Sequence, residues 1–287
     1  MKSRRQLELH RHSLGEIRDI MNAMKNLAYM ETRKLEGFVA AQHAVLEGIE
    51  AVAGDFVSSF PEALPEQKSG REIYLLVGSE RGFCGDFNAA LLHQLQLAER
   101  DKAAGALPVL VATGRKLQTA LDGHPRAAAL LEGASVVEEV EAVLIRLIGK
   151  LATLHTEYGA PYLYALYHGD DQGTPLTRKL LPPFQEHLRE VTGLAQPPLL
   201  NLPAPDFLVQ LTEHYLFAAL NEILYTSLLA ENQRRVRHLD GAVDHLDEHA
   251  AELARQSNAR RQEEIIEEIE VILLSAASLR KPASQRR

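Results

Sequence analysis

The chain has 287 residues, with no tryptophan, a single cysteine and only 6% aromatic residues, although 46% of its residues are hydrophobic. Cys84 has no second cysteine with which to form an internal disulfide, which is typical of a reducing compartment. Many alanines and leucines with few aromatic residues favour cores in which helices pack on helices. The net charge of −8 argues against a nucleic-acid-binding protein, which would need a basic face.

Long apolar runs are also missing from the sequence. No stretch reaches the roughly 18 residues that a membrane-spanning helix requires. The first residues, Met1 to Arg5, are basic, but no hydrophobic signal segment follows them. We therefore expect an intracellular protein whose connection to any membrane is made by a partner.

Proline is absent from the C-terminal stretch Asp206 to Leu279, which contains one glycine, Gly241. Apolar residues recur there at alternating steps of three and four, the pattern of a helix that buries one narrow stripe against another helix. These residues are Val236, Leu239, Val243, Leu246, Ala250 and Leu253. A continuous helix over this stretch would be roughly 110 Å long at about 1.5 Å per residue, so we expect it to project as a rod.

The N-terminal stretch, residues 1–58, also lacks proline and follows a heptad pattern. Seven heptads favour a coiled-coil arm over an ordinary amphipathic helix. Its polar positions are His10, Glu31 and Gln42, which fix the register or face a third surface. The predicted seam is Leu7, His10, Leu14, Ile17, Met21, Met24, Ala28, Glu31, Leu35, Phe38, Gln42, Val45, Ile49, Val52 and Phe56.

Between the two arms, residues 68–200 predict a small, mainly parallel, Rossmann-like α/β domain. Pro61 and Pro65 separate it from the first arm, and Leu180–Pro183 and Pro197–Pro205 are predicted to be turn-rich links. Short apolar runs predict three strands and the segments between them three helices. The strands are Ile73–Val77, Leu107–Ala112 and Pro161–Tyr167; the helices are Asn88–Glu99, Gly114–Leu121 and Val136–His155.

Because both arms leave the same α/β insert, they can return on each other as an antiparallel coiled coil. If Phe56 lies opposite Asp206, then Met1 lies opposite Arg261, and the C-terminal helix is longer than its partner. Its far end carries many apolar residues that nothing else in the chain would cover. Such a surface marks an interaction site, and we expect a partner protein to form a sleeve around it. A basic tail, residues 280–287, follows.

The loop Gly78–Asn88 lies between a predicted strand and a predicted helix, the setting of a phosphate-binding loop. It lacks both glycine-rich nucleotide fingerprints, so we interpret it as a tight turn and docking surface. Arg81 could lower the pKa of Cys84, but a structural thiol is favoured because no histidine–carboxylate set accompanies it. His168–Asp171 is interpreted as a turn rather than a cation site. Histidines at helical spacing, His238, His245 and His249, are interpreted as solvated rather than metal-binding.

Three motifs, in the same order along the chain, resemble the γ subunits of F-type ATP synthases. Gly78-Ser-Glu-Arg-Gly-Phe-Cys-Gly-Asp-Phe-Asn88 is similar to the family's Ser-Asp-Arg-Gly-Leu-Cys-Gly loop, and Ala23-Met24-Lys25 to its Ala-Met-Lys. Arg261-Gln262, Glu268 and Ser275–Leu279 are similar to the family's C-terminal motifs. The chain departs from the family at Ile17–Met21, at Glu31 and at Ile266.

The resemblance implies a central shaft, an α/β foot and no catalysis by the chain itself. It implies contacts with the α and β subunits of the catalytic hexamer, the ε subunit and the membrane ring of c subunits, and no cofactor, metal or nucleic acid. It implies a peripheral location on the cytoplasmic face of the bacterial plasma membrane. The residues implied to contact the hexamer are Met24, Lys25, Arg261, Gln262, Glu268, Ile269, Ile272 and Leu279. Those implied to form the foot loop are Ser79, Glu80, Arg81, Gly82, Cys84, Gly85 and Asn88.

Two other interpretations use the same patterns. The insert could bind a nucleotide in an enzyme whose arms dimerise, although it shows no acid–base pair or nucleophile set. The arms could also form a homodimeric coiled-coil scaffold.

Overall fold

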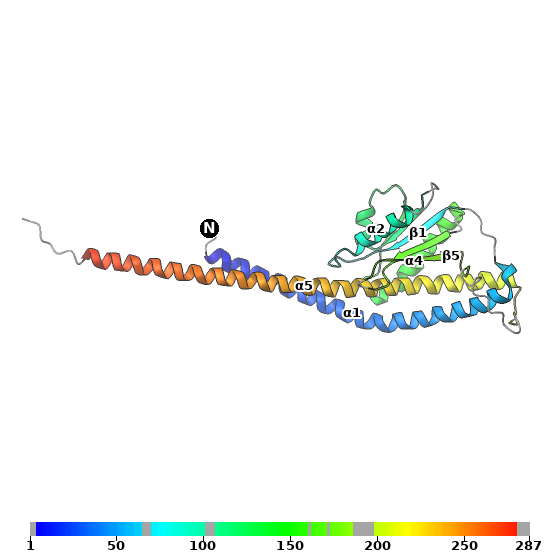
Figure 1. The fold of residues 1–287 in the computed structure, drawn as a ribbon, viewed down its shortest axis with the longest axis horizontal. Coiled ribbons are helices and arrows are strands. Elements are labelled where there is room, and N and C mark those ends of the chain that lie inside the picture. The colour runs from blue at the N-terminus through cyan, green and yellow to red at the C-terminus, as the bar shows by residue number, and fades with distance from the viewer. Residues whose placement is uncertain are drawn as a thin grey trace, which may run out of the picture. The chain divides into compact units, whose positions relative to one another are not determined.

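A computed structural model describes residues 4–64, 70–100, 107–159, 162–170, 173–185 and 198–279, without the side chains of 277–279. The predicted tail 280–287 and Asp171 lie outside the described residues. The chain forms two compact units, residues 1–25 with 239–287 (unit 1) and residues 26–238 (unit 2). Two long helices, α1 (Arg4–Ser59) and α5 (Ala204–Leu279), contribute to both units (Figure 1).

Unit 2 contains a five-stranded sheet with the order β3-β2-β1-β4-β5, parallel except for β5. The strands are β1 (Glu72–Val77), β2 (Val109–Thr113), β3 (Ala127–Leu131), β4 (Tyr162–Tyr167) and β5 (Leu176–Leu181). The helices between them are α2 (Phe87–Arg100), α3 (Arg115–Leu121) and α4 (Val140–Tyr158), with short 3-10 turns η1 (Pro61–Ala63) and η2 (Val137–Glu139). The mainly parallel α/β fold expected for the middle of the chain is confirmed.

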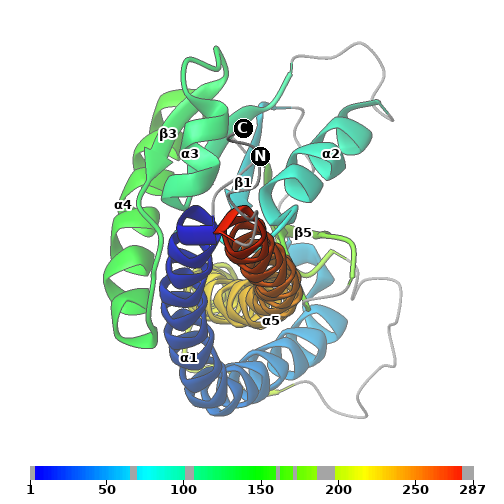
Figure 2. The same cartoon turned by 90° about the vertical axis from the view of Figure 1, so that its left-hand side faces the viewer.

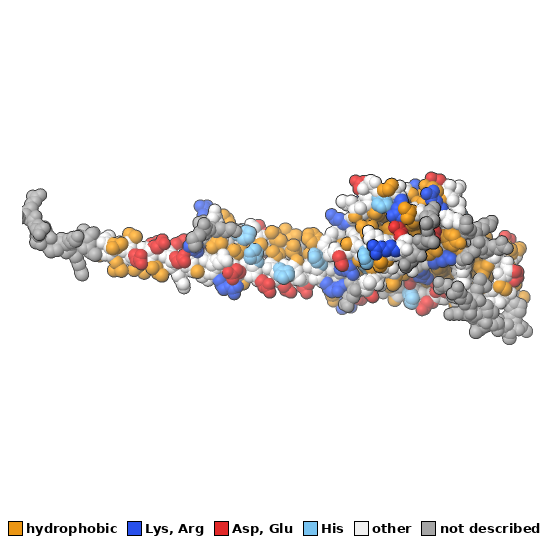
Figure 3. All heavy atoms as spheres, turned by 45° about the horizontal axis from the view of Figure 1, so that its top comes forward, with side chains coloured by type: hydrophobic (Ala, Val, Ile, Leu, Met, Phe, Trp, Pro, Cys, Tyr) orange, Lys and Arg blue, Asp and Glu red, His pale blue; other side chains and the backbone are white. Residues whose placement is uncertain are grey.

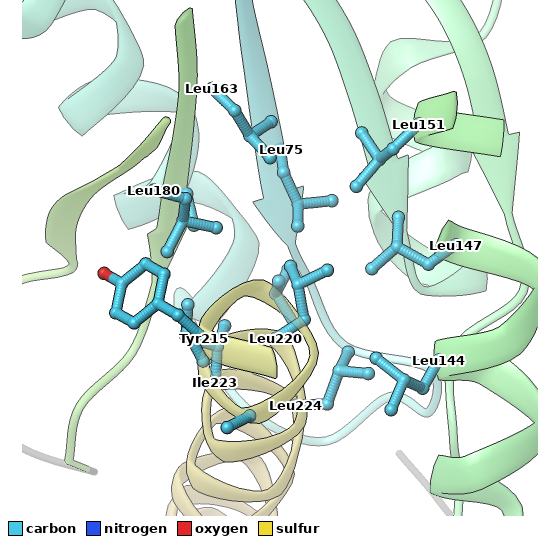
Figure 4. Packing of buried hydrophobic residues seen from close by; sticks show 14 of the residues in the cluster. Leu75, Leu144, Leu147, Leu151, Leu163, Leu180, Tyr215, Leu220, Ile223 and Leu224 are labelled. Atoms are coloured by element: carbon cyan, nitrogen blue, oxygen red, sulfur yellow. The ribbon is translucent and has the colours of Figure 1, made fainter. Parts of the chain in front are cut away.

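Helices cover both faces of this sheet, which is why β1 is an unbroken apolar run. Ile73, Leu75 and Val77 point to the face that holds α4, α1 and α5. Tyr74 and Leu76 point to the opposite face, which holds α2 and α3. Figure 4 shows leucines of β1, β4, β5 and α4 converging on α5 in the first of these cores, which makes α5 part of the domain core.

Two strands were not expected from the sequence. β3 is an alanine-rich segment at one sheet edge, where the intrinsic preference for helix is overridden by pairing with β2. β5 pairs antiparallel with β4 at the other edge and carries the polar residues Thr177, Arg178 and Lys179. Charged residues are common on edge strands, where they discourage pairing with other chains. The prediction of a link at Leu180–Pro183 is therefore wrong for Leu180 and Leu181, which end this strand.

In unit 2 the later part of α1 and the first part of α5 run antiparallel. The rings of Phe56 and Phe207 lie 4.9 Å apart, and Phe38 stacks on Tyr225 at 5.4 Å. These pairs lie within one residue of the register expected from the sequence.

The heptad predicted for α1 is observed only in part. Leu7, Leu14, Ala28, Leu35 and Phe56 are buried as predicted, but Ile17, Phe38, Val45 and Val52 are exposed, and Leu46 and Ala53 are buried instead. A straight α-helix drifts by about 20° per heptad relative to a strict repeat of seven. At Leu46 and Ala53 the buried stripe of α1 is displaced by one residue, in the direction of that drift.

In unit 1, α1 and α5 lie side by side and antiparallel, as Figures 1 and 2 both show. Leu7, Leu14 and Leu253 form a small apolar core to which Leu246 packs. Arg18 pairs with Asp247 at 3.2 Å on the exposed side of this core. Leu239 and Val243 are buried on the same stripe of α5, which confirms the seam predicted there. No helix in the described ranges is both long and apolar enough to cross a lipid bilayer.

Candidate functional site

The loop between β1 and α2 is closed by a reciprocal pair of hydrogen bonds. The backbone N–H of Ser79 donates to Asn88 Oδ1 (3.0 Å), and Asn88 Nδ2 donates to Ser79 Oγ (2.8 Å). Gly78 allows this approach, because a Cβ at this position would lie 2.4 Å from the Cβ of Leu117. The loop is therefore a rigid connection between the strand and the helix.

A buried carboxylate of α5 holds this loop. Glu231 is 3% exposed and accepts hydrogen bonds from the backbone N–H groups of Glu80 and Arg81, both at 3.2 Å. Arg235, one turn further along α5, forms an ion pair with Glu231 and donates to the carbonyl of Gly82 (3.0 Å). Burial raises the pKa of Glu231, and the charge of Arg235 and the two backbone donors oppose that shift.

Glu80 makes a second internal set of contacts. Its Oε2 accepts hydrogen bonds from the backbone N–H groups of Arg115 and Gly133, both at 2.8 Å, and its Oε1 lies 3.2 Å from Arg115 Nε. A phosphate-binding loop presents free backbone N–H groups to its ligand. In this loop Glu231 occupies two of those donors, so the contacts favour a structural turn over a nucleotide site.

Only part of the predicted foot loop can face a partner. Ser79, Glu80 and Cys84 are buried, whereas Arg81, Phe83 and Gly85 are exposed. Burial raises the pKa of Cys84, and its thiol donates to the carbonyl of Arg81 (3.7 Å), so the interpretation as a structural thiol is supported. Among the described residues no group of three potential ligands could hold a metal ion.

A buried histidine, His168, contacts Phe87 at the end of the same loop. The sequence did not predict this contact. The ring of His168 stacks on Phe87 at 3.9 Å, and its Nε2 lies 2.9 Å from the carbonyl oxygen of Phe87. A carbonyl only accepts, so Nε2 carries a proton and donates. Burial lowers the pKa of His168, which keeps the ring neutral.

The first predicted hexamer contact, Met24 and Lys25, lies in unit 1. Met24 is half-buried, and Lys25 Nζ lies 2.8 Å from Asp240 Oδ1 of α5. Lys25 therefore pairs with a carboxylate of its own chain. The sequence did not predict this partner, because Lys25 lies beside the heptad seam rather than on it.

The second predicted contact region is the far end of α5. The last described contact with α1 is between Arg4 and Glu264 at 3.7 Å, and every described side chain from 261 to 276 is exposed, apolar ones included. Ile269 is 50% and Ile272 63% exposed. Figure 3 shows hydrophobic and acidic side chains interleaved near the end of this helix. Arg261, Gln262 and Glu268 lie on the same exposed segment, whereas the side chain of Leu279 lies outside the described residues.

Known relatives match the chain over nearly its full length. It is 24% identical to the ATP synthase gamma chain of Moorella thermoacetica over 289 residues, covering 98% of this chain and all of that protein. The gamma chain of Verminephrobacter eiseniae is 25% identical over 283 residues, covering 93% and 94% of the two chains.

Solved structures share the fold. The rotor of the Euglena gracilis mitochondrial ATP synthase superimposes with a TM-score of 0.63 at 13% identity, covering 91% of this chain and 98% of that one. The central stalk of the Tetrahymena thermophila mitochondrial enzyme gives 0.53 at 14% identity, covering 78% and 99%. The chain matches the ATP synthase family over residues 3–279, and it therefore belongs to that family, among the gamma chains.

Proposed function

We propose that this chain is the central-stalk rotor of a bacterial F-type ATP synthase and that it couples ion flow through a membrane ring to ATP synthesis or hydrolysis. In this proposal the chain catalyses no reaction. It turns inside the hexamer of α and β subunits, and its α/β domain, residues 68–200, is the foot that holds the ε subunit and the c-ring. The chain would be peripheral to the plasma membrane on its cytoplasmic face.

The observation that carries the proposal is the uncovered far end of α5. Fully burying an isoleucine, valine or leucine side chain stabilises by about 1.5–3 kcal/mol, and this segment leaves at least seven of them exposed. They are Ile265, Ile266, Ile269, Val271, Ile272, Leu273 and Leu274. Because they lie on several sides of the helix, a partner that surrounds it covers more of them than a flat surface would. Apolar contacts have no direction, so such a sleeve lets the helix turn.

The residues proposed to contact the hexamer are the half-buried pair Met24 and Lys25 and the exposed end of α5. Met24 and Lys25 would contact an acidic stretch of the β subunits. As the shaft turns, Lys25 would leave its ion pair with Asp240 and pair with a carboxylate of that stretch. Arg261, Gln262 and Glu268 would hydrogen-bond the loops around the helix, and Ile269, Ile272 and Leu279 would lie in the sleeve. In the foot, the exposed residues Arg81 and Gly85 would face the ε subunit and the c-ring.

Co-purification tests this proposal. The chain is expressed with its α and β subunits, β carrying an affinity tag, and the mass of the purified complex is measured under native conditions. We expect one copy of the chain in each hexamer. The variant Ile269→Asp/Ile272→Asp should reduce its recovery strongly, because charges in an apolar sleeve are costly.

Ile145→Asp in α4 is the matched control, since Ile145 is also apolar and 60% exposed but lies outside the proposed sleeve. Equal recovery of the tip variant and the control would contradict a sleeve around α5. A stable homodimer that ignores α and β would support the scaffold interpretation instead. Clear thermal stabilisation of the isolated chain by nucleotides would support the enzyme interpretation.

A further inference from the structure

One arginine of β5 joins the sheet to both long helices within unit 2. Arg178 Nη2 lies 2.6 Å from Glu50 Oε1 of α1, and Arg178 Nη1 lies 2.8 Å from Glu222 Oε2 of α5. The side chains of all three residues are at most one third exposed. The planar guanidinium therefore bonds one carboxylate on each helix, and each bond is charge-assisted and directional.

The same level of the helices carries further ties. His43 Nδ1 of α1 lies 3.0 Å from the second oxygen of Glu222, and this carboxylate raises the pKa of His43. Asn221 Nδ2 donates to Gln42 Oε1 at 3.1 Å, so the polar position Gln42 of the α1 seam has a partner on α5. Together these contacts connect β5, α1 and α5 in one polar cluster.

Beside this cluster, β5 packs on α5 through apolar side chains, and further along α5 the hydroxyl of Ser227 donates a hydrogen bond to the carbonyl of Val77 in β1 (3.3 Å). Leu180 of β5 and Leu220 and Ile223 of α5 belong to one buried core. Apolar packing resists separation of two surfaces, but it is not directional and resists sliding less well. A fixed fork of charged hydrogen bonds opposes sliding because each bond weakens steeply as its geometry changes.

We infer that Arg178, with Glu50 and Glu222, is a torque clamp that makes the sheet domain and both helices turn as one body. This inference rests on the proposed rotor function and adds positioning residues to it. A rotor loaded from its foot must pass torque from the sheet to the helices, and this cluster is where one side chain touches all three elements.

The test uses the assembled ATP synthase in sealed, inverted membrane vesicles. The variant Arg178→Met/Glu50→Gln/Glu222→Gln removes the three charges together. Removing one partner alone would leave a partly buried charge without its counter-charge, which is destabilising. ATP hydrolysis is measured beside ion uptake, with a pH-sensitive dye for protons and radioactive sodium for Na⁺. We expect this variant to leave ATP hydrolysis unchanged in the complex of the chain with α and β that is detached from the membrane. In vesicles we expect the ratio of ions moved to ATP hydrolysed to fall about five-fold or more.

Two further variants sharpen the result. Arg178→Lys keeps the charge but lacks the planar fork of the guanidinium, so the ratio should be intermediate. Glu252→Gln/Arg255→Met removes an exposed ion pair within α5 and should leave the ratio unchanged.

A clamp variant with the normal ratio of ions to ATP would overturn the inference. So would a parallel fall in hydrolysis, transport and thermal stability, which indicates a purely structural cluster. If the unmodified chain supports no coupled transport at all, the proposed function fails rather than the clamp.

Discussion

Glu231 shows how one buried side chain can decide the chemistry of a loop. The sequence around Gly78–Asn88 has the setting of an anion-binding turn, and an anion does bind there, but it is a carboxylate from α5. This contact spans about 150 residues of sequence, so the loop alone could not reveal it. The available signal was the i, i+4 pair Glu231 and Arg235 on a helix face that is otherwise buried.

Glu231→Gln is expected to destabilise the isolated chain by about 3–5 kcal/mol, because it leaves the guanidinium of Arg235 buried without a counter-charge. Urea unfolding followed by circular dichroism measures this. Glu252→Gln, which removes an exposed carboxylate paired with Arg255, should leave the stability almost unchanged, because exposed ion pairs are screened by solvent. Similar losses for both variants would show that the buried pair has no special role.

His168 predicts a pH dependence of stability. Its pKa in the folded chain lies below that of an unfolded histidine, about 6.5, so the folded state binds fewer protons. Its contribution to stability is therefore complete above about pH 6.5 and decreases as the pH falls, by at most about 1.4 kcal/mol per pH unit. Thermal unfolding from pH 7.5 to 5 measures this slope.

The variant His168→Gln should show a smaller slope between pH 6.5 and 5, because its side chain does not titrate there. His12→Gln, which replaces an exposed histidine of α1, is the control and should keep the slope of the unmodified chain. An unchanged slope in His168→Gln would contradict the assignment of a neutral, buried ring.

At the scale of elements, sequence periodicity predicts the long helices well and their contact faces less well. The expected seam of α1, Leu7 to Phe56, lies within the observed helix Arg4–Ser59, and the aromatic pairs of unit 2 lie within one residue of the register expected with α5. The heptad count missed the buried positions Leu46 and Ala53, because it assumes a strict repeat of seven residues and a straight helix drifts from that repeat. β3 was missed because its alanines favour a helix, and β5 because Thr177, Arg178 and Lys179 interrupt its apolar residues.

The shifted face gives a prediction for two adjacent residues of α1. Leu46→Ala should destabilise the chain by about 2–5 kcal/mol, because it removes a buried side chain and leaves a cavity. Val45→Ala should change stability by no more than about 0.5 kcal/mol, because Val45 is exposed. Urea unfolding of both variants measures the difference, and the reverse order would restore the strict heptad.

At the scale of the whole molecule, sequence alone indicated the resemblance to γ subunits, because the order arm, insert, arm and the three motifs span the entire chain. The sequence did not reveal which side chains join the sheet to the long helices within unit 2. Arg178 lies in a segment interpreted without a strand, and its partners Glu50 and Glu222 are far away in sequence. Only the fold brings the three together, so the proposed torque clamp depended on the structure.

The central claim is that this chain rotates within the catalytic hexamer. The most direct test immobilises the complex through its β subunits and attaches a bead to the chain at Arg146→Cys, an exposed position of α4. Cys84 is buried, so within this chain the new thiol is the one that reacts. We predict that ATP drives continuous rotation of the bead in one direction. A bead that stays fixed while the same complexes hydrolyse ATP would contradict the account.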